Sequence, residues 1–208
     1  MNLKSLELNF FKRDARLVAK DLIGKIIIRK YDNNTLIARI VETEAYIGKI
    51  DKASHAYNYK RTPRTETLFS EAGIIYVYKI YGMYNCMNIV TGDKDDPQGV
   101  LIRAIEPISG LDIMTLNRFN KTLDSITKKE FLNLTSGPGK LCIAMNIDKS
   151  LNAHSIFSNE ISLYEDGFNN FEIVHAKRIG IDYAEEAVDF LWRYYIKDNK
   201  FVSVISKD

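Results

Sequence analysis

The sequence has few residues of the kinds that break a chain into disordered pieces or staple a small fold together. Four prolines and eleven glycines are spread over 208 residues, of which 46% are hydrophobic, and this composition is typical of a globular protein. A chain of this length buries about two-thirds of its unfolded surface, so it needs no disulfide or structural metal. Cys86, Cys142 and the three scattered histidines show no ligand spacing, which predicts reduced thiols and no metal site.

Long apolar runs and a strong charge of one sign are also missing. No run approaches the roughly 18 residues of a membrane span, and charged residues interrupt the first 24 residues, which argues against a signal peptide. We therefore expect a cytoplasmic protein that does not enter membranes. The net charge of +2 is too small to indicate a nucleic-acid partner by itself. Basic clusters at 60–64, 128–129 and 177–178 are candidate phosphate contacts, although each alone is more often a solvated surface.

The predicted elements follow a mixed order that is rich in hairpins. Apolar residues at helical spacing predict a helix over 10–23. Strands are expected at 25–30, 35–46, 74–80, 85–90, 99–105, 161–164, 172–178 and 201–205, and further helices at 66–71, 109–117 and 139–145. Pro107 is expected to end its strand, and 118–134 to be a mobile surface segment. We predict an α+β fold, a single domain over 1–208, with a mixed, mostly antiparallel β-sheet, surrounding helices and a protruding β-hairpin.

Two carboxylates lie close together in the expected strand from Thr35 to Tyr46. In a regular strand the side chains of Glu42, Glu44 and Tyr46 would share one face. That face is either exposed to solvent, or it holds one glutamate as a general base whose charge is tuned by partial burial. The spacing alone leaves both interpretations open.

Four tyrosines fall within nine residues around an expected hairpin. Tyrosines in strands are commonly core residues or cross-strand pairs, and this interpretation suits Tyr76 and Tyr84. It does not suit Tyr81, which with Gly82 and Met83 would form a hairpin tip that projects from the core. A rigid ring at such a tip is suited to wedging between stacked bases, and rings inside a pocket are suited to stacking on a base.

Arg103 lies in the otherwise apolar stretch 101–107. A buried charge without a partner is costly, so this arginine needs an anionic or polar neighbour. A structural pair with a glutamate and a pair with a catalytic carboxylate or a phosphate are both compatible with the sequence.

The stretch 135–142 contains Ser-Gly-Pro-Gly directly before an expected helix. Turns of this kind can bind a phosphate through the free N–H groups of the first helical turn. The spacing differs from that of a nucleotide-binding P-loop, and a plain turn before a helix explains the residues almost as well.

Taken in order, these segments resemble the alkyladenine (3-methyladenine) DNA glycosylase family. The matching stretches are IVETEAY at 40–46, His55 followed by TPR at 62–64, YVYKIYGMYNCMN at 76–88, GVLIRAIEP at 99–107, SGPGKLC at 136–142 and RIGI at 178–181. The resemblance implies an enzyme that turns alkylated or deaminated purines out of duplex DNA, hydrolyses the bond between base and sugar, and leaves an abasic site. No cofactor is implied.

The resemblance also implies catalytic roles for individual residues. Glu44 matches the general base that activates a water, Arg103 helps to hold that water, and the backbone carbonyl of Ile179 is its third ligand. Glu42 has no catalytic counterpart. We expect a monofunctional enzyme, because no lysine is expected in the pocket to act as a nucleophile.

Other matched residues are implied to contact the base and the duplex. The pocket that stacks on the extruded base is formed by Tyr46, His55 and Tyr78. Asn88 hinders guanine by crowding its 2-amino group. Tyr81, with Met83 beside it, fills the gap that the extruded base leaves in the duplex.

The implied partner is double-stranded DNA with a damaged purine, and we expect a monomer that is nucleoid-associated when bound. The expected contacts to the DNA backbone are Lys60, Arg61, Arg64, Lys140 and Arg178. The tyrosine-rich stretch 56–61 and the segment 118–133 depart from the family pattern, which leaves the preferred damaged bases open. Two alternatives from other classes are a non-catalytic nucleic-acid-binding module and a hydrolase of free nucleosides or glycosides.

Overall fold

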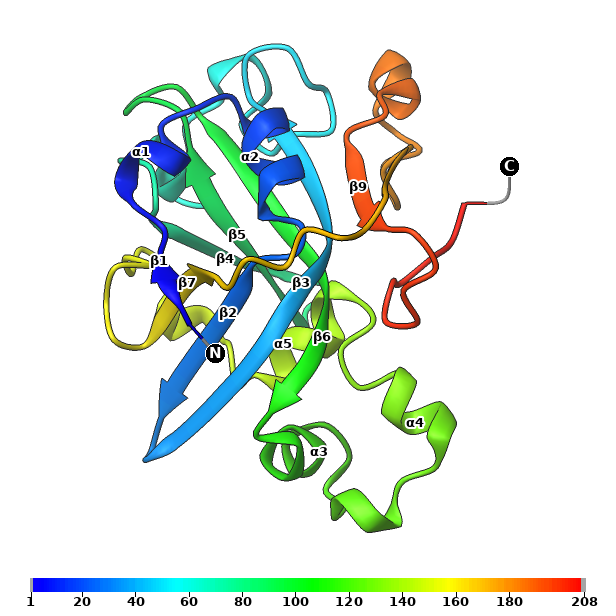
Figure 1. The fold of residues 1–208 in the computed structure, drawn as a ribbon. Helices are drawn as coiled ribbons and strands as arrows, with labels where there is room; N and C mark the ends of the chain where they lie inside the picture. The colour runs from blue at the N-terminus through cyan, green and yellow to red at the C-terminus, as the bar shows by residue number, and fades with distance from the viewer. Residues whose placement is uncertain (1, 207–208) are drawn as a thin grey trace.

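One antiparallel sheet runs through the middle of the molecule (Figure 1), and the computed structural model describes residues 2–206. Its nine strands pair in the order β1-β7-β2-β3-β6-β5-β4, with β9 joined to β3 and β8 joined to β9. The bounds are β1 Lys4–Ser5, β2 Ile26–Tyr31, β3 Asn34–Ile47, β4 Ile75–Ile80, β5 Tyr84–Thr91, β6 Gln98–Ser109, β7 Ile161–Glu165, β8 Ile173–Ala176 and β9 Arg193–Ile196. The structure confirms the predicted α+β class and antiparallel sheet.

The long strand β3 organises the sheet. It spans 14 residues and pairs with β6 along one edge, while β2 and then β9 pair along the other. The turn that leads into it consists of Asp32 and Asn33, whose φ angles of 44° and 65° suit the two-residue turns favoured in hairpins. As a result, Glu42 and Glu44 lie between two neighbouring strands in the middle of the sheet.

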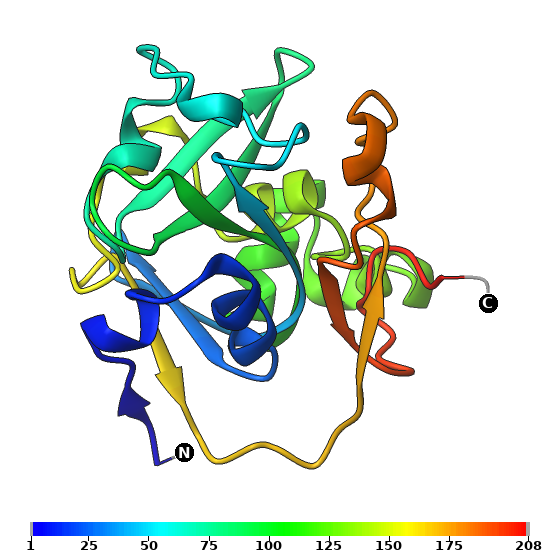
Figure 2. The same ribbon diagram turned by 90° about the horizontal axis from the view of Figure 1, so that it is seen from above.

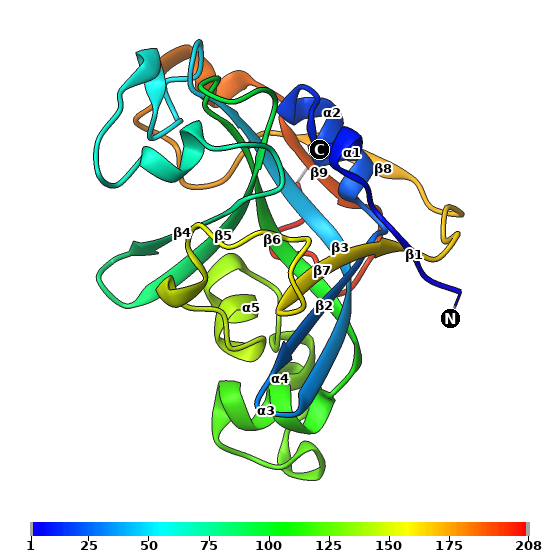
Figure 3. The same cartoon turned by 90° about the vertical axis from the view of Figure 1, so that its left-hand side faces the viewer.

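Helices cover both faces of the sheet (Figure 3). The helices α1 (Leu8–Phe11) and α2 (Ala15–Leu22) lie on one face, and α3 (Leu111–Phe119) and α5 (Pro138–Ala144) lie on the other. The single helix predicted over 10–23 is wrong in one respect, because it is divided at Asp14. The Asp14 carboxylate accepts a hydrogen bond from the Arg16 backbone N–H and thereby caps a new helix. The buried face of α2 is Ala15, Val18, Ala19 and Leu22.

The predicted hairpin is confirmed as β4 and β5, which pair from Ile75 and Ile89 to Ile80 and Tyr84. It projects beside two other segments, the loop that follows β3 and the segment that precedes β9 (Figure 2). All three therefore lie on the same side of the molecule.

Two local predictions are wrong, and two strands, β1 and β9, were not predicted. Strand β6 continues through Pro107 to Ser109, where the pairing with β3 shifts register and a missing N–H is tolerated. The stretch 201–205 is not a strand, and β9 was not predicted. Part of 118–134 forms the short helix α4 (Lys128–Leu132), which begins with a capping box between Thr127 and Glu130.

No helix in the described part of the chain is long and apolar enough to cross a membrane.

Candidate active site

Two irregularities in the pairing of β3 with β6 bring three charged side chains together. The register shifts on either side of Glu42, so that Val41 and Arg103 each stand as an extra residue in their strand. Such bulges re-aim side chains and are common beside active sites. Arg103 Nε lies 3.2 Å from Glu42 Oε1, and its Nη1 lies 3.3 Å from Glu44 Oε2. Arg103 therefore pairs with both glutamates.

The Glu44 carboxylate is held by three donors. Its Oε1 accepts from the Ile179 backbone N–H at 2.8 Å, and its Oε2 accepts from the Tyr46 hydroxyl at 2.7 Å and from Arg103. Burial, followed by the nearby Glu44 charge, raises the pKa of Tyr46 well above its usual value, so the hydroxyl stays a donor. An ionised carboxylate offers about four acceptor positions, and within residues 2–206 the position without a donor lies on Oε1.

Burial decides between the two interpretations of the glutamate face. Glu42 and Glu44 both have 0% exposed surface, so the solvent-exposed interpretation is wrong. The contacts are consistent with the prediction that Glu42, Glu44 and Tyr46 lie on one face of the strand. Both glutamates accept hydrogen bonds from Arg103, and Glu44 accepts one from Tyr46. Both glutamates contact Arg103, which lines the neighbouring cleft, but only Glu44 also contacts the lining residues Tyr46 and Ile179.

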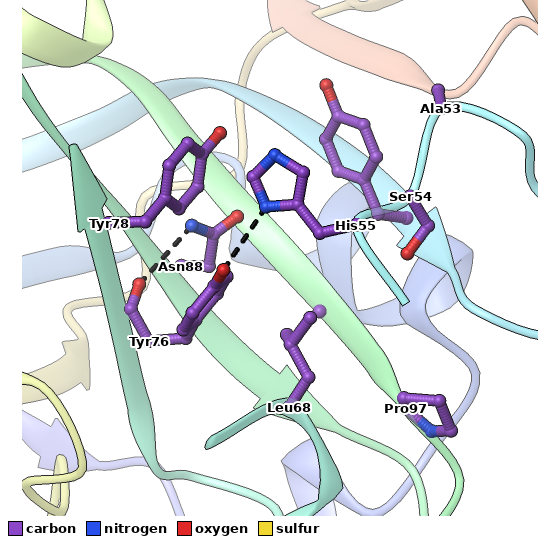
Figure 4. A pocket seen from close by; sticks show the side chains of 10 residues that line it. Ala53, Ser54, His55, Leu68, Tyr76, Tyr78, Asn88 and Pro97 are labelled. Atoms are coloured by element: carbon purple, nitrogen blue, oxygen red, sulfur yellow. Dashed lines mark hydrogen bonds between the residues drawn. The ribbon is translucent and has the colours of Figure 1, made fainter. Parts of the chain in front are cut away.

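An aromatic pocket lies beside this carboxylate (Figure 4). The His55 ring packs edge-on against Tyr78, with ring centroids 4.5 Å apart. Asn88 is held by a hydrogen bond of 3.3 Å from its Nδ2 to the Tyr76 carbonyl oxygen. The pocket is lined by Tyr46, Ala53, Ser54, His55, Leu68, Tyr76, Tyr78, Asn88, Pro97 and Gly99. The four residues predicted to form a base pocket are therefore brought together.

The hydrogen bonds of His55 define its protonation state. Burial, aided by the Arg64 charge, lowers the pKa of His55 to about 4, so the ring is neutral near pH 7. Nε2 lies 3.3 Å from Arg64 Nη2, which can only donate. The ring proton is therefore on Nδ1, from which it is donated to the Tyr76 hydroxyl at 3.1 Å.

The tip of the β4–β5 hairpin presents two large apolar side chains to solvent. Tyr81 is 86% exposed and Met83 is 65% exposed. Tyr81 has a φ of 51°, in the left-handed region, and Gly82 follows with 70°. This conformation is uncommon for a tyrosine.

An open cleft extends from the hairpin tip to residues that hold the buried Glu44 carboxylate. Its walls include Tyr81 from the hairpin, Arg64 from the loop after β3, and Tyr183 from the segment before β9, which are the three projecting segments of Figure 2. Its floor includes Arg103 and Ile179, both of which contact Glu44. The cleft also shares four residues with the aromatic pocket, Tyr46, Ala53, His55 and Tyr78. Lys79 lies in it as well, so the expectation of no lysine in the pocket segments is wrong.

The structure separates the basic residues that were expected to contact the DNA backbone. Lys60 and Arg64 are exposed, and Arg64 lies at the cleft with its Cζ 5.5 Å from the Tyr78 ring. Arg61 is also exposed but pairs with Glu66 and Asp95. Lys140 is partly buried and donates to Asn133 at 2.7 Å. Phosphate contacts by these four residues remain predictions.

The structure contradicts the backbone role for Arg178. Its side chain has 0% exposed surface and pairs with the equally buried Asp51. Arg178 also donates to the carbonyl oxygens of Ala45 and Ala187. The guanidinium lies 4.7 Å from the Tyr46 ring, so this arginine supports the site from within the fold and has no surface to offer a phosphate.

Three residues near the site were not predicted from sequence. Tyr76 was assigned to the core, yet its hydroxyl fixes the His55 ring. Tyr183 is 67% exposed at the cleft, and Arg193 pairs with Glu42 at 2.9 Å. No spacing signal pointed to these residues, because each acts on a partner that is distant in the chain.

Comparison with known proteins shows the family of the chain. The sequence profile described as methylpurine-DNA glycosylase (MPG) matches residues 9–200. Proteins named "Putative 3-methyladenine DNA glycosylase" from Clostridium botulinum (strain Alaska E43 / Type E3) and Alkaliphilus oremlandii (strain OhILAs) are each 54% identical over 198 residues, covering 95% of this chain and 98% of theirs. One from Clostridium perfringens (strain 13 / Type A) is 54% identical, with 94% and 97% covered. The chain belongs to the methylpurine-DNA glycosylase family.

Proposed function

We propose that this DNA glycosylase turns a damaged purine nucleotide out of duplex DNA and hydrolyses its base–sugar bond with a water that Glu44 activates. The substrates are alkylated purines, such as the 3-methyladenine in its relatives' names, and deaminated purines. The observation that carries the proposal is the placement of Glu44, a buried carboxylate with one free acceptor position directly behind a cleft that opens into an aromatic pocket.

The surroundings of Glu44 suit a general base. Three donors orient the carboxylate, and the free position on Oε1 lies on the atom that also accepts from Ile179. A water bound there would be held by Glu44, with Arg103 and the Ile179 carbonyl as the further contacts that the family resemblance implies. As the bond to the base breaks, positive charge develops on the sugar, and the negative carboxylate stabilises that charge while it accepts the water proton.

The pocket suits a purine. Tyr46, His55 and Tyr78 provide ring faces and edges, and stacking on aromatic side chains is available to every base. A purine that carries a positive charge after alkylation gains further from electron-rich rings. Because His55 is neutral, it adds no positive charge that would repel such a base.

The exposed hairpin tip offsets part of the cost of extrusion. Turning a nucleotide out of the stack costs a few kcal/mol, least for a damaged or mispaired base. Tyr81 and Met83 are exposed next to the cleft, so they are placed to fill the space that the base leaves. Apolar side chains at such tips commonly act as wedges between base steps.

Strand cleavage is not part of the proposed reaction. Lys79 lies in the cleft but is exposed to solvent, whereas a nucleophilic lysine is usually desolvated or placed next to another cation. We expect borohydride to trap no covalent adduct between protein and DNA. A trapped adduct that disappears in Lys79→Gln would contradict the monofunctional reaction.

The test uses end-labelled duplexes that each contain a single hypoxanthine or ethenoadenine, together with methylated DNA, all in EDTA. Wild type is compared with Glu44→Gln and with the surface control Glu71→Gln. Strand breaks are measured with and without hot alkali, which cleaves abasic sites. We expect breaks only after alkali, with wild type and Glu71→Gln but not with Glu44→Gln.

The outcomes separate the alternatives. Retained excision in Glu44→Gln would remove Glu44 from the mechanism. Binding of all duplexes without excision by wild type would favour the non-catalytic nucleic-acid-binding module.

A further inference from the structure

We propose that Glu42 is a positioning residue that holds Arg103 in place against Glu44, and that the C-terminal stretch 203–206 completes this arrangement. The inference rests on the proposed role of Glu44 as the base. It assigns a role in the reaction to a glutamate that does not itself line the cleft, and to a stretch of chain that forms neither a helix nor a strand.

The hydrogen bonds of the Glu42 carboxylate connect Arg103 to Arg193 and to the C-terminal stretch. The side chain has no exposed surface. Its Oε1 accepts from Arg103 Nε at 3.2 Å and from Arg193 Nη1 at 2.9 Å. Its Oε2 accepts from the Ser203 backbone N–H at 2.7 Å. Glu42 therefore fixes the Nε side of Arg103, while the Nη1 of the same guanidinium meets Glu44.

The C-terminal stretch fixes the other members of the cluster. Arg193 Nη1 donates to the Val204 carbonyl oxygen at 2.8 Å, and its Nη2 donates to Ser206 Oγ at 2.9 Å. Arg103 Nη2 lies 3.4 Å from Ser203 Oγ. Val204 and Ile205 are 49% and 64% exposed, so this stretch contributes little apolar burial. Most of its hydrogen bonds are with the buried charged side chains of Glu42, Arg103 and Arg193.

The charges of the cluster balance only when Glu42 is present. Glu42 and Glu44 supply two negative charges, and Arg103 and Arg193 supply two positive charges. Without the Glu42 charge, Arg103 would keep Glu44 as its carboxylate partner, and Arg193 would have no carboxylate partner among the described residues. Arg103 would lose its Nε anchor and a defined orientation, and small misplacements of catalytic groups are costly to rate. Glu42 thus acts through Arg103 and not on the substrate.

The first experiment compares Glu42→Gln with a matched control, Asp166→Asn. Like Glu42, Asp166 pairs with an arginine, Arg39, at 2.8 Å, and both side chains are nearly buried. Among the described residues, this pair makes no hydrogen bond or ion pair with the cluster. We measure the single-turnover excision rate at saturating enzyme, the half-saturating enzyme concentration and the melting temperature. For Glu42→Gln we expect at least a tenfold lower rate with a half-saturating concentration within threefold of wild type. For Asp166→Asn we expect a lower melting temperature and an unchanged rate.

A double-mutant cycle tests whether Glu42 acts through Arg103. If it does, adding Glu42→Gln to Arg103→Lys should slow excision by less than threefold beyond Arg103→Lys alone. Independent effects that multiply would overturn the proposal, and so would a wild-type rate in Glu42→Gln. If Glu44→Gln also retained its excision activity, the proposed function itself would fail. If Glu44→Gln were inactive and Glu42→Gln had the wild-type excision rate, only the positioning role would be rejected.

A second variant covers the case in which Glu42→Gln does not fold. A chain ending at Val202 keeps the buried Phe201 and Val202 but lacks the N–H that binds Glu42 and the acceptors that bind Arg193. We expect this chain to fold, as judged by circular dichroism, and to excise at least threefold more slowly with similar half-saturation. A wild-type excision rate in the folded, shortened chain would reject the role of the C-terminal stretch.

Discussion

Arg178→Met should destabilise the fold without changing the ionic contacts to DNA. The Arg178 guanidinium is completely buried and bonds with both carboxylate oxygens of Asp51. It also holds the carbonyl oxygens of Ala45 and Ala187 at 2.8 and 3.2 Å. Methionine fills much of the same space but leaves Asp51 as a buried carboxylate without its cationic partner.

The contacts that remain set the size of this effect. Removal of one partner from a buried ion pair costs about 3–5 kcal/mol. Asp51 would keep the Ala53 backbone N–H at 3.0 Å and a longer bond of 3.4 Å from Ile47 N–H. We therefore expect a loss near the lower end, about 3 kcal/mol, which is a large share of the roughly 5–15 kcal/mol that stabilises a typical domain. With an m-value of about 2 kcal/mol/M, the urea midpoint should fall by about 1.5 M.

Urea unfolding followed by far-ultraviolet circular dichroism measures this loss, and the salt dependence of DNA binding provides the contrast. A phosphate contact contributes about −0.9 to the slope of log affinity against log salt, so an unchanged slope is expected. The double variant Asp51→Asn/Arg178→Met should recover part of the lost stability, because no lone charge is left buried. A stability loss below about 1 kcal/mol together with a shallower salt slope would refute the structural role and restore the phosphate contact.

Two further predictions concern the aromatic residues. Tyr81→Ala should weaken binding to duplexes with a damaged base about tenfold, since stacking on one ring is worth about 1–3 kcal/mol. In a fluorescence anisotropy titration, the control Tyr81→Phe should bind normally. An unchanged Kd for Tyr81→Ala would contradict the role of Tyr81 as a wedge. Burial and Arg64 lower the pKa of His55 to about 4 in the folded protein, below the value of about 6.5 in the unfolded chain. The unfolded state therefore binds more protons between these values, and stability should fall by about 2 kcal/mol from pH 7.5 to pH 5 through this group. His55→Gln should lack that part of the pH dependence in urea titrations, and an equal dependence in both proteins would contradict the neutral histidine.

The sequence was a good guide where the physics is local. Alternation along β3 placed Glu42 and Glu44 together, and turn residues located the hairpin that carries Tyr81. The β-bulges that let Arg103 reach both glutamates have no signature in the spacing of polar and apolar residues, because each adds only one residue to a strand. Similarly, the division of the first helix depends on a single capping carboxylate at Asp14.

Contacts between distant parts of the chain limited the site prediction. Arg178 was taken for a surface cation because its partner, Asp51, lies 127 residues away. Glu42 showed no role because Arg193 and Ser203 lie 151 and 161 residues away. Burial of a charge is a property of the assembled fold, so neither composition nor periodicity distinguishes these residues from solvated ones.

The exclusion of undamaged guanine provides the sharpest test of the pocket. Hypoxanthine and guanine differ only in the 2-amino group, and Asn88 is 5% exposed in the pocket wall, with its amide fixed by the Tyr76 carbonyl oxygen. A fixed amide cannot swing aside, so the family role implied for Asn88 requires a steric clash with that amino group. Asn88→Ser removes the amide, and we expect it to excise guanine from G·T mismatches while retaining hypoxanthine excision within tenfold of wild type.

The control for this test is Asn85→Ser, on the same strand but outside the pocket lining, which should excise hypoxanthine and reject guanine as wild type does. If Asn88→Ser keeps its hypoxanthine activity and still leaves guanine untouched, the amide is not the barrier. Guanine would then be excluded at the extrusion step, because a guanine that stays stacked in the duplex does not enter the pocket. Binding of the variant to duplexes with guanine opposite an abasic site, where extrusion is cheaper, would separate these two origins.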